Sequence, residues 1–169
     1  MGRRTSCLDP NNASSLNEVS RADALVARLR QVSAELIATI EGIDSTTWSR
    51  VPSAGVWSVG KDAEHVAEGN AYHQWIVRTT LGEKVSSKRP PLERAQLTTP
   101  LSVPRMVELL RKRTEESADL IGHCTDDQLD LPTRPPRPRA STLAEVVEQV
   151  LIGHIDTHRR AIQSKLQSG

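Results

Sequence analysis

The chain has 169 residues, and its 22 Lys and Arg against 21 Asp and Glu give a formal net charge of +1. This balance offers no strong positive field for a nucleic-acid backbone, and no apolar run is long enough to span a bilayer, so we expect neither a nucleic-acid nor a membrane partner. With one Tyr, three Trp and no Phe, the core must be built from Leu, Val, Ile and Ala.

Residues 1–14 are polar and lack helical periodicity, which predicts a flexible N-terminal tail followed by a single domain over residues 15–169. Residues 1–12 contain no apolar run typical of a signal peptide. Cys7 and Cys124 are far apart in the sequence and form no CxxC pair or disulfide framework. We therefore expect a cytoplasmic protein.

The first predicted helix begins at Ser15, which forms a capping-box pattern with Glu18. Apolar residues at helical spacing then continue from Val19 to Ile40. A packed connector with two tryptophans follows over residues 43–57, because tryptophans are rarely left in water. Ser58 is placed to cap a second helix that ends near residue 80.

Residues 82–101 are rich in Gly, Ser, Lys, Arg and Pro and predict a long crossover without a helix. A third helix is predicted over residues 102–121, with Ser102 as its cap. The loop over residues 126–140 contains Arg134, Arg137 and Arg139 among four prolines. It has two interpretations: a solvated connector, or a positively charged wall for an acidic substrate.

The last helix is predicted over residues 142–162, where Thr142 and Glu145 form a capping-box pattern. Its apolar stripe passes through Leu143, Val146, Val147, Val150 and Leu151, and extends to His154, His158, Ala161 and Ile162. No segment has the period of a strand. The pattern therefore predicts an all-α protein, a four-helix bundle with a long crossover between its second and third helices.

His154 and His158 lie four residues apart, so both imidazoles would share one face of the last helix and could converge on one cation. The alternative is that they are core or interface histidines with hydrogen-bond partners. A third histidine, His65, is predicted about two turns inside the second helix, after Trp57 and Ser58.

The Trp57-Ser58 pair followed by His65, together with the His154-x-x-x-His158 pair, resembles the DinB-like (DinB/YfiT) family over roughly residues 20–166. This resemblance implies a four-helix bundle, usually homodimeric, in which His65, His154 and His158 hold a divalent metal at an open site. Family members include thiol S-transferases that use low-molecular-weight thiols, a mycothiol-dependent maleylpyruvate isomerase, and proteins described as metal-dependent hydrolases.

Three neutral imidazoles leave a further coordination position open, which is typical of catalytic zinc sites. We therefore expect zinc, with nickel or another transition metal as the alternative. His73 lies about 12 Å along the helix from His65 and cannot share its ion, so His73 and Tyr72 are expected to line a pocket or a helix interface. Asp62 and Glu68 lie one turn from His65 and either orient imidazoles or carry surface charge.

No nucleophile can be placed beside the three histidines, because Cys7 and Cys124 share no helical register with them. The attacking group would then be water or a cosubstrate thiolate activated by the metal. We predict an S-transferase that joins a low-molecular-weight thiol to a small electrophilic substrate, in a homodimer. The alternatives are a metal-dependent hydrolase and a non-enzymatic bundle that binds metal or dimerises.

Overall fold

The computed structural model describes residues 19–86, 100–137 and 140–168. Its elements in chain order are α1 (Arg21–Ile40), α2 (Ser45–Ser49), α3 (Val59–Thr80), α4 (Val103–Gly122), α5 (Asp126–Leu129), β1 (Pro132–Arg137), β2 (Ala140–Thr142), α6 (Leu143–Glu145), the π-helical segment η1 (Val146–Ile152) and α7 (Gly153–Gln167). The all-α fold predicted from the sequence is confirmed. Among these residues, no helix has the length and apolar character needed to cross a membrane.

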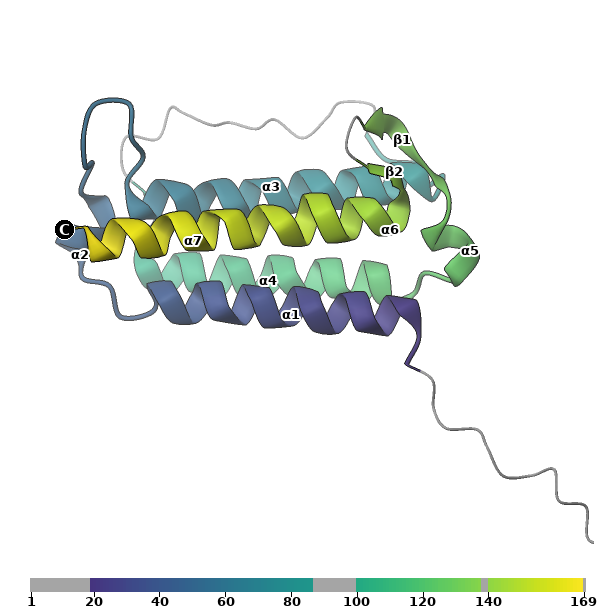
Figure 1. Cartoon of the computed structure of the whole chain (residues 1–169), viewed down its shortest axis with the longest axis horizontal. Coiled ribbons are helices and arrows are strands. Elements are labelled where there is room, and N and C mark those ends of the chain that lie inside the picture. The colour runs from purple at the N-terminus through teal and green to yellow at the C-terminus, as the bar shows by residue number, and fades with distance from the viewer. Residues whose placement is uncertain (1–18, 87–99, 138–139, 169) are drawn as a thin grey trace, which may run out of the picture.

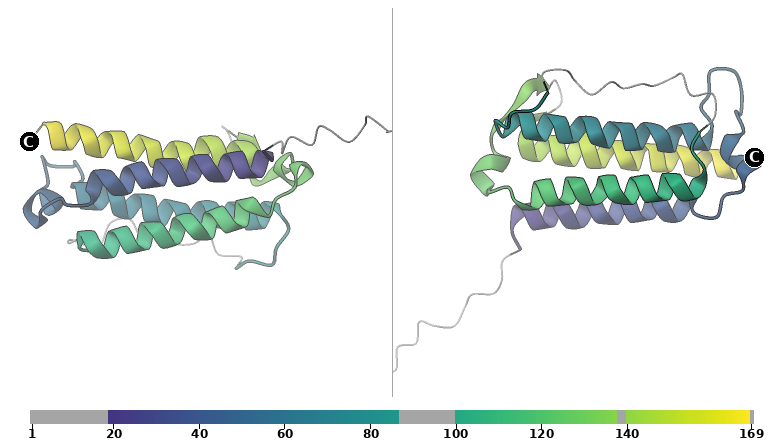
Figure 2. Two further views of the ribbon diagram at one scale, coloured as in Figure 1. Left: turned by 90° about the horizontal axis from the view of Figure 1, so that it is seen from below. Right: turned by 180° about the vertical axis from the view of Figure 1, so that it is seen from behind.

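The long helices α1, α3, α4 and α7 lie side by side along one axis (Figures 1 and 2). Helix α1 packs against α4 and α7, and α3 packs against the same two helices. The helices α3 and α4 run in the same direction, so Arg78 near the end of α3 and His123 at the end of α4 line one cavity. The crossover predicted between them falls mostly on residues 87–99, outside the described residues.

Aliphatic side chains at helical spacing build the interior, as the composition requires. The four long helices and η1 contribute fully buried residues to it, among them Leu29, Leu36, Ile40, Ile76, Met106, Ile121, Leu151, Ile155 and Ile162. Removing this apolar surface from water is the main contribution to folding. The core therefore fixes the distance between α3 and α7, the two helices that carry the predicted metal ligands.

The described part of α1 begins later than the sequence predicted. Ser20 is the N-cap, and its side chain accepts a hydrogen bond from the backbone N–H of Asp23 at 3.0 Å. Val19 lies before the helix and is 70% exposed, so its assignment to the apolar stripe was wrong. The predicted cap at Ser15 and the partner Glu18 lie outside the described residues, as does the whole of the predicted tail over residues 1–14.

The connector before α3 buries only one of its two tryptophans. Trp48 in α2 is buried, and its indole N–H donates to the backbone oxygen of Leu101 at 2.7 Å. Trp57 is 37% exposed, so the expectation that both indoles would be buried is only half right. Ser58 caps α3 as predicted, accepting from the backbone N–H of Lys61 at 3.2 Å.

The predicted loop after α4 instead contains the short helix α5 and an antiparallel hairpin, β1 with β2. The expectation that no strand would occur was wrong because tertiary contacts hold this segment extended. The backbone N–H of Arg134 donates to the hydroxyl of Thr80 at 3.0 Å, which ties β1 to the end of α3. Thr133 also donates from its buried hydroxyl to the backbone oxygen of Ala140 at 3.1 Å.

The predicted last helix starts at Thr142 as expected, with the capping box to Glu145 present. It then passes through η1, where i→i+5 hydrogen bonds put more residues into each turn than an α-helix has. The helix after η1 is consequently rotated relative to a continuous α-helix. Ile152 and Ile155 become core residues, whereas the predicted core positions His154 and His158 are only partly buried.

Candidate metal centre

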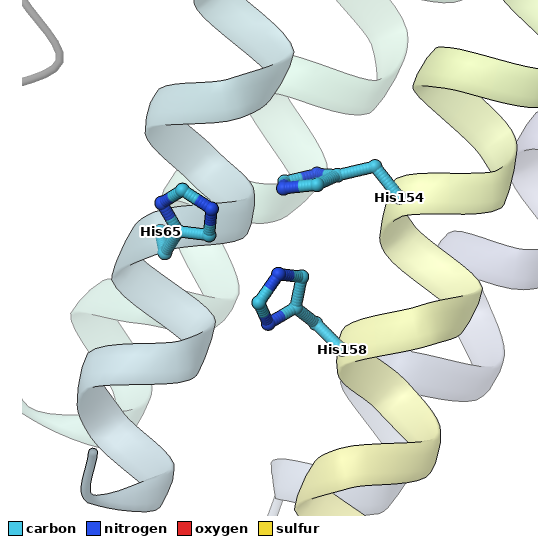
Figure 3. A group of neighbouring side chains, drawn as sticks. All are labelled: His65, His154 and His158. Carbon is cyan, nitrogen blue, oxygen red and sulfur yellow. The ribbon is translucent and has the colours of Figure 1, made fainter. Parts of the chain in front are cut away.

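Two helices running in opposite directions bring three imidazoles together. Figure 3 shows His65 on α3 facing His154 and His158, which lie one turn apart on α7. The ring centroids are 4.9 Å apart for His65 and His154, 4.8 Å for His65 and His158, and 4.7 Å for His154 and His158. All three side chains are partly buried. We call these residues the histidine triad.

The histidine triad fits a transition-metal ion. One nitrogen from each ring can be chosen so that the three atoms lie within 4.8 Å of one another. Zinc–imidazole bonds of about 2.0–2.1 Å put the ligand nitrogens of a tetrahedral site about 3.4 Å apart, so ring shifts of about 1 Å complete the fit. Imidazole nitrogens are also ligands that suit zinc, nickel, copper and iron.

Asp62 on α3 orients one ring of the triad. Its carboxylate Oδ1 lies 3.2 Å from His158 Nδ1, and its Oδ2 accepts a hydrogen bond from the ammonium group of Lys165. Burial by itself would raise the pKa of Asp62, but the hydrogen bonds from His158 and Lys165 outweigh it and leave the pKa below its ordinary value. An ionised carboxylate only accepts, so His158 Nδ1 carries the proton and Nε2 is left for a metal.

Trp57 covers the triad from the connector before α3. Its ring lies 5.0 Å from that of His65, edge to face, and 6.4 Å from that of His158 in a near-parallel stack. The backbone oxygen of Trp57 accepts from Lys165 Nζ at 2.8 Å. Lys165 therefore holds both this loop and Asp62 in place at the end of the site nearest the C-terminus.

His73 and Tyr72 lie beyond the triad along α3. His73 is buried, and its ring is 5.4 Å from that of His154, so it borders the site without reaching His65. Tyr72 is buried with Ile76, Ala140 and Val146, and stacks on Trp75 with ring centroids 6.0 Å apart. Tyr72 thus lies in a helix and hairpin interface, while His73 borders the site, and the sequence had left both placements open.

Two other predicted site residues have surroundings that the structure describes. Glu68 lines a cavity with Leu101, Leu109 and Arg113 on the side of α3 that faces α4. Arg134 is bonded to Thr80, about 22 Å further along α3 than His65, so it forms no wall of this site. The side chains of Arg137 and Arg139 lie outside the described residues.

The described cysteine also lies away from the triad. Cys124 follows α4 and lines the cavity at the opposite end of the bundle from Trp57, together with Arg78 and His123. Burial raises the pKa of its thiol, and the nearby charge of Glu83 raises it further. Cys124 is therefore poorly suited to act as a nucleophile, and Cys7 lies outside the described residues.

Sequence reasoning found the triad and Asp62 but missed Lys165 and the role of Trp57 against the rings. Lys165 lies seven residues after His158, which is two turns on the same helix face, so helical spacing contained a usable indication. The position of the Trp57 ring depends on a loop conformation that has no periodic pattern.

The fold and the site together define an all-α bundle protein with a candidate three-histidine metal centre between antiparallel helices. A family model described as the DinB superfamily matches residues 22–162. This match covers most of the chain, including all three histidines of the triad, so the chain belongs to the DinB superfamily. Neither the curated proteins nor the solved structures give a match.

Proposed function

We propose that the chain is a divalent-metal-dependent enzyme that transfers a low-molecular-weight thiol to a small electrophilic substrate. The observation that carries the proposal is the convergence of three imidazoles from α3 and α7. Three imidazole ligands leave coordination positions open, as catalytic zinc sites do. A divalent cation bound there supplies a positive charge that favours ionisation of a thiol at neutral pH.

Two carboxylates of α3 are poorly suited to act as the base of a hydrolase, which favours thiol transfer over hydrolysis. Hydrolysis usually needs a carboxylate or another base to take a proton from water. Asp62 is a weak base here, because its hydrogen bonds to His158 and Lys165 keep its pKa below the ordinary value. Glu64 is buried and already bonded to Lys61 Nζ and to the backbone N–H of Leu101, both at 2.8 Å.

The other residues at the site hold the imidazoles and limit water. Asp62 fixes the tautomer and the orientation of the His158 ring, so less reorganisation accompanies ligand binding. The partly exposed Trp57 covers His65 and His158 and offers an aromatic surface to an incoming substrate. A bound electrophile would meet the thiolate at this face of the triad.

The metal part of the proposal is tested by elemental analysis of protein purified without a His tag, followed by zinc titration of the unaltered chain and of His65→Ala, His154→Ala and His158→Ala. We expect about one equivalent of zinc for the unaltered chain and a large loss of affinity in each variant. His123→Ala is the matched control, because this histidine lies at the end of α4 and its Nδ1 is 2.6 Å from the backbone oxygen of Asp119. Unchanged zinc affinity in all three triad variants would contradict the proposal.

The reaction is tested by incubating metal-loaded protein with glutathione, mycothiol or bacillithiol and a reactive electrophile. We expect conjugation above the uncatalysed rate with at least one thiol, and its loss in His154→Ala. Equal rates for the two proteins with all three thiols would exclude transfer of these thiols. Turnover of an ester or amide that requires the metal but no thiol would instead support the hydrolase alternative.

A further inference from the structure

A glycine interrupts the face of α3 that points toward the triad. Gly69 lies in the interior of this 22-residue helix, where its backbone is helical and no turn or positive φ calls for glycine. Glycine in a helix interior is less favourable than alanine, because more backbone freedom is lost on folding. A glycine at such a position is explained when another group occupies the volume of its missing side chain.

The imidazole of His154 occupies that volume. A Cβ atom built on Gly69 would lie 2.5 Å from Cε1, 3.0 Å from Nδ1 and 3.4 Å from Nε2 of His154. The first distance is far below a normal carbon–carbon contact of about 3.5–4.0 Å. The ring of His154 therefore rests directly on the backbone of α3, a position that any side chain at residue 69 would block.

Two further imidazoles border the same position. His65 precedes Gly69 by four residues and His73 follows it by four, so the three residues form one row along α3. The ring of His154 lies 4.9 Å from that of His65 and 5.4 Å from that of His73, edge to face in both cases. The ring is thus held between two imidazoles above the glycine.

We propose that Gly69 is a positioning residue for the metal centre, because it alone gives His154 room to approach His65 closely enough to share an ion. This inference rests on the proposed metal-binding function. The atoms that an alanine methyl would meet belong to the end of the His154 side chain rather than to backbone. The added methyl group therefore displaces the imidazole and leaves the helices in place.

The first experiment is a zinc titration of Gly69→Ala, His154→Ala and the double variant, by calorimetry or competition with a chelating dye. We expect Gly69→Ala to weaken zinc binding about 10- to 100-fold, in the range found when the groups that orient metal ligands are altered. Gly69→Ala should have no further effect in the His154→Ala protein, because the ring that it displaces is then absent. Equal losses in both backgrounds, or no loss in the first, would overturn the proposal.

Gly122→Ala is the matched control. Gly122 is the last residue of α4, and a Cβ atom there would meet only Val26 Cγ2 at an ordinary 3.8 Å. We expect this variant to bind zinc as the unaltered chain does. A comparable loss in Gly122→Ala would mean that glycine replacement in any helix disturbs the site, and would overturn the specific role of Gly69.

The second experiment measures thermal unfolding of the same variants without metal, and so separates the glycine contact from the metal function. Gly69→Ala should raise the unfolding midpoint in the His154→Ala background by about 1–4 °C, as a helix-favouring change in a chain of this size does. The rise should be smaller in the unaltered background, where the methyl group meets the ring. Equal rises in both backgrounds would overturn the contact itself. If the variants show this coupling but the unaltered chain binds no zinc, the contact stands, and the proposed function is excluded together with the metal role of Gly69.

Discussion

Asp62 has two partners on α7, and they make it both a ligand-orienting and a helix-joining residue. Its side chain is 5% exposed and accepts from His158 and from Lys165, which lie two turns apart on one face of α7. A buried carboxylate without such donors would cost several kcal/mol of desolvation, so Asp62 depends on the hydrogen bonds from His158 and Lys165. The site is therefore stabilised by the same contact that orients its imidazole.

Asp62→Asn should weaken zinc binding by about 10- to 100-fold. An amide orients the His158 ring less firmly than a carboxylate does, and it no longer favours the tautomer that carries its proton on Nδ1 and leaves Nε2 for the metal. Zinc titration by calorimetry measures the change. Glu115→Gln is the control, since Glu115 carries the same charge but pairs with Arg30 across α1 and α4 at 2.6 Å. Zinc affinity that falls equally in both variants would show a general charge effect rather than the orientation of His158.

At the scale of single residues, the features set by helical spacing were predictable from the sequence. The one-turn separation of His154 and His158 and the position of Asp62 one turn before His65 are both consequences of the helical repeat. The close packing of Gly69 against His154 could not be predicted, because it depends on the distance between α3 and α7. That distance is set by the whole core.

The start of the last helix depends on a capping box whose acidic member titrates. Glu145 accepts from the hydroxyl of Ser141 at 2.7 Å and from the backbone N–H groups of Ser141 and Thr142 at 2.6 and 3.2 Å. The hydrogen bond from the Ser141 hydroxyl, followed by those from the backbone, lowers the pKa of Glu145. Its protonation should therefore loosen the segment that leads into η1.

Because the pKa of Glu145 is lower in the folded state, its charge adds stability above the unfolded pKa of about 4.3, and this is lost as the pH falls through the folded value. Glu145→Gln keeps a capping side chain but does not titrate. Urea unfolding at about pH 6 and about pH 3 should show that the stability advantage of the unaltered chain over Glu145→Gln shrinks at low pH. An advantage that is equal at both pH values would contradict this assignment.

At the scale of elements, the long helices were predictable and the irregular ones were not. Apolar spacing and the caps at Ser58 and Thr142 located α3 and the last helix. The π-helical turns of η1 could not be recognised from the apolar stripe, because its residues, such as Val146 and Val147, suit an α-helix as well as a π-helix. The hairpin was missed because its prolines favour a loop until the contact with Thr80 holds β1 extended.

At the scale of the molecule, the homodimer implied by family resemblance stays a prediction. The chain has a mass of 18.6 kDa, so light scattering after gel filtration should give twice this mass if the prediction holds. The triad is formed within one chain, because all three histidines come from α3 and α7 of the same protomer. Dilution to the monomer should therefore leave zinc stoichiometry per chain unchanged, and a loss of zinc on dilution would contradict a site within one chain.

The fold should not depend on the metal, since the core and the triad draw on different residues of the same helices. Leu29, Ile76, Ile121 and Ile155 are fully buried in the interior, whereas the triad lies partly buried beside it. A chain of this length buries enough apolar surface to fold without a structural metal. Chelation with EDTA should therefore leave the far-ultraviolet circular dichroism spectrum helical. It should lower the unfolding midpoint only as far as the lost binding free energy of the ion requires. A chain that loses its helical spectrum on chelation would show that the metal is structural, and would contradict a core that folds on its own.

Ile155→Ala is the opposite case, because it should reduce the free energy of unfolding by about 2–5 kcal/mol through the cavity that it leaves, while the folded protein still binds one zinc ion.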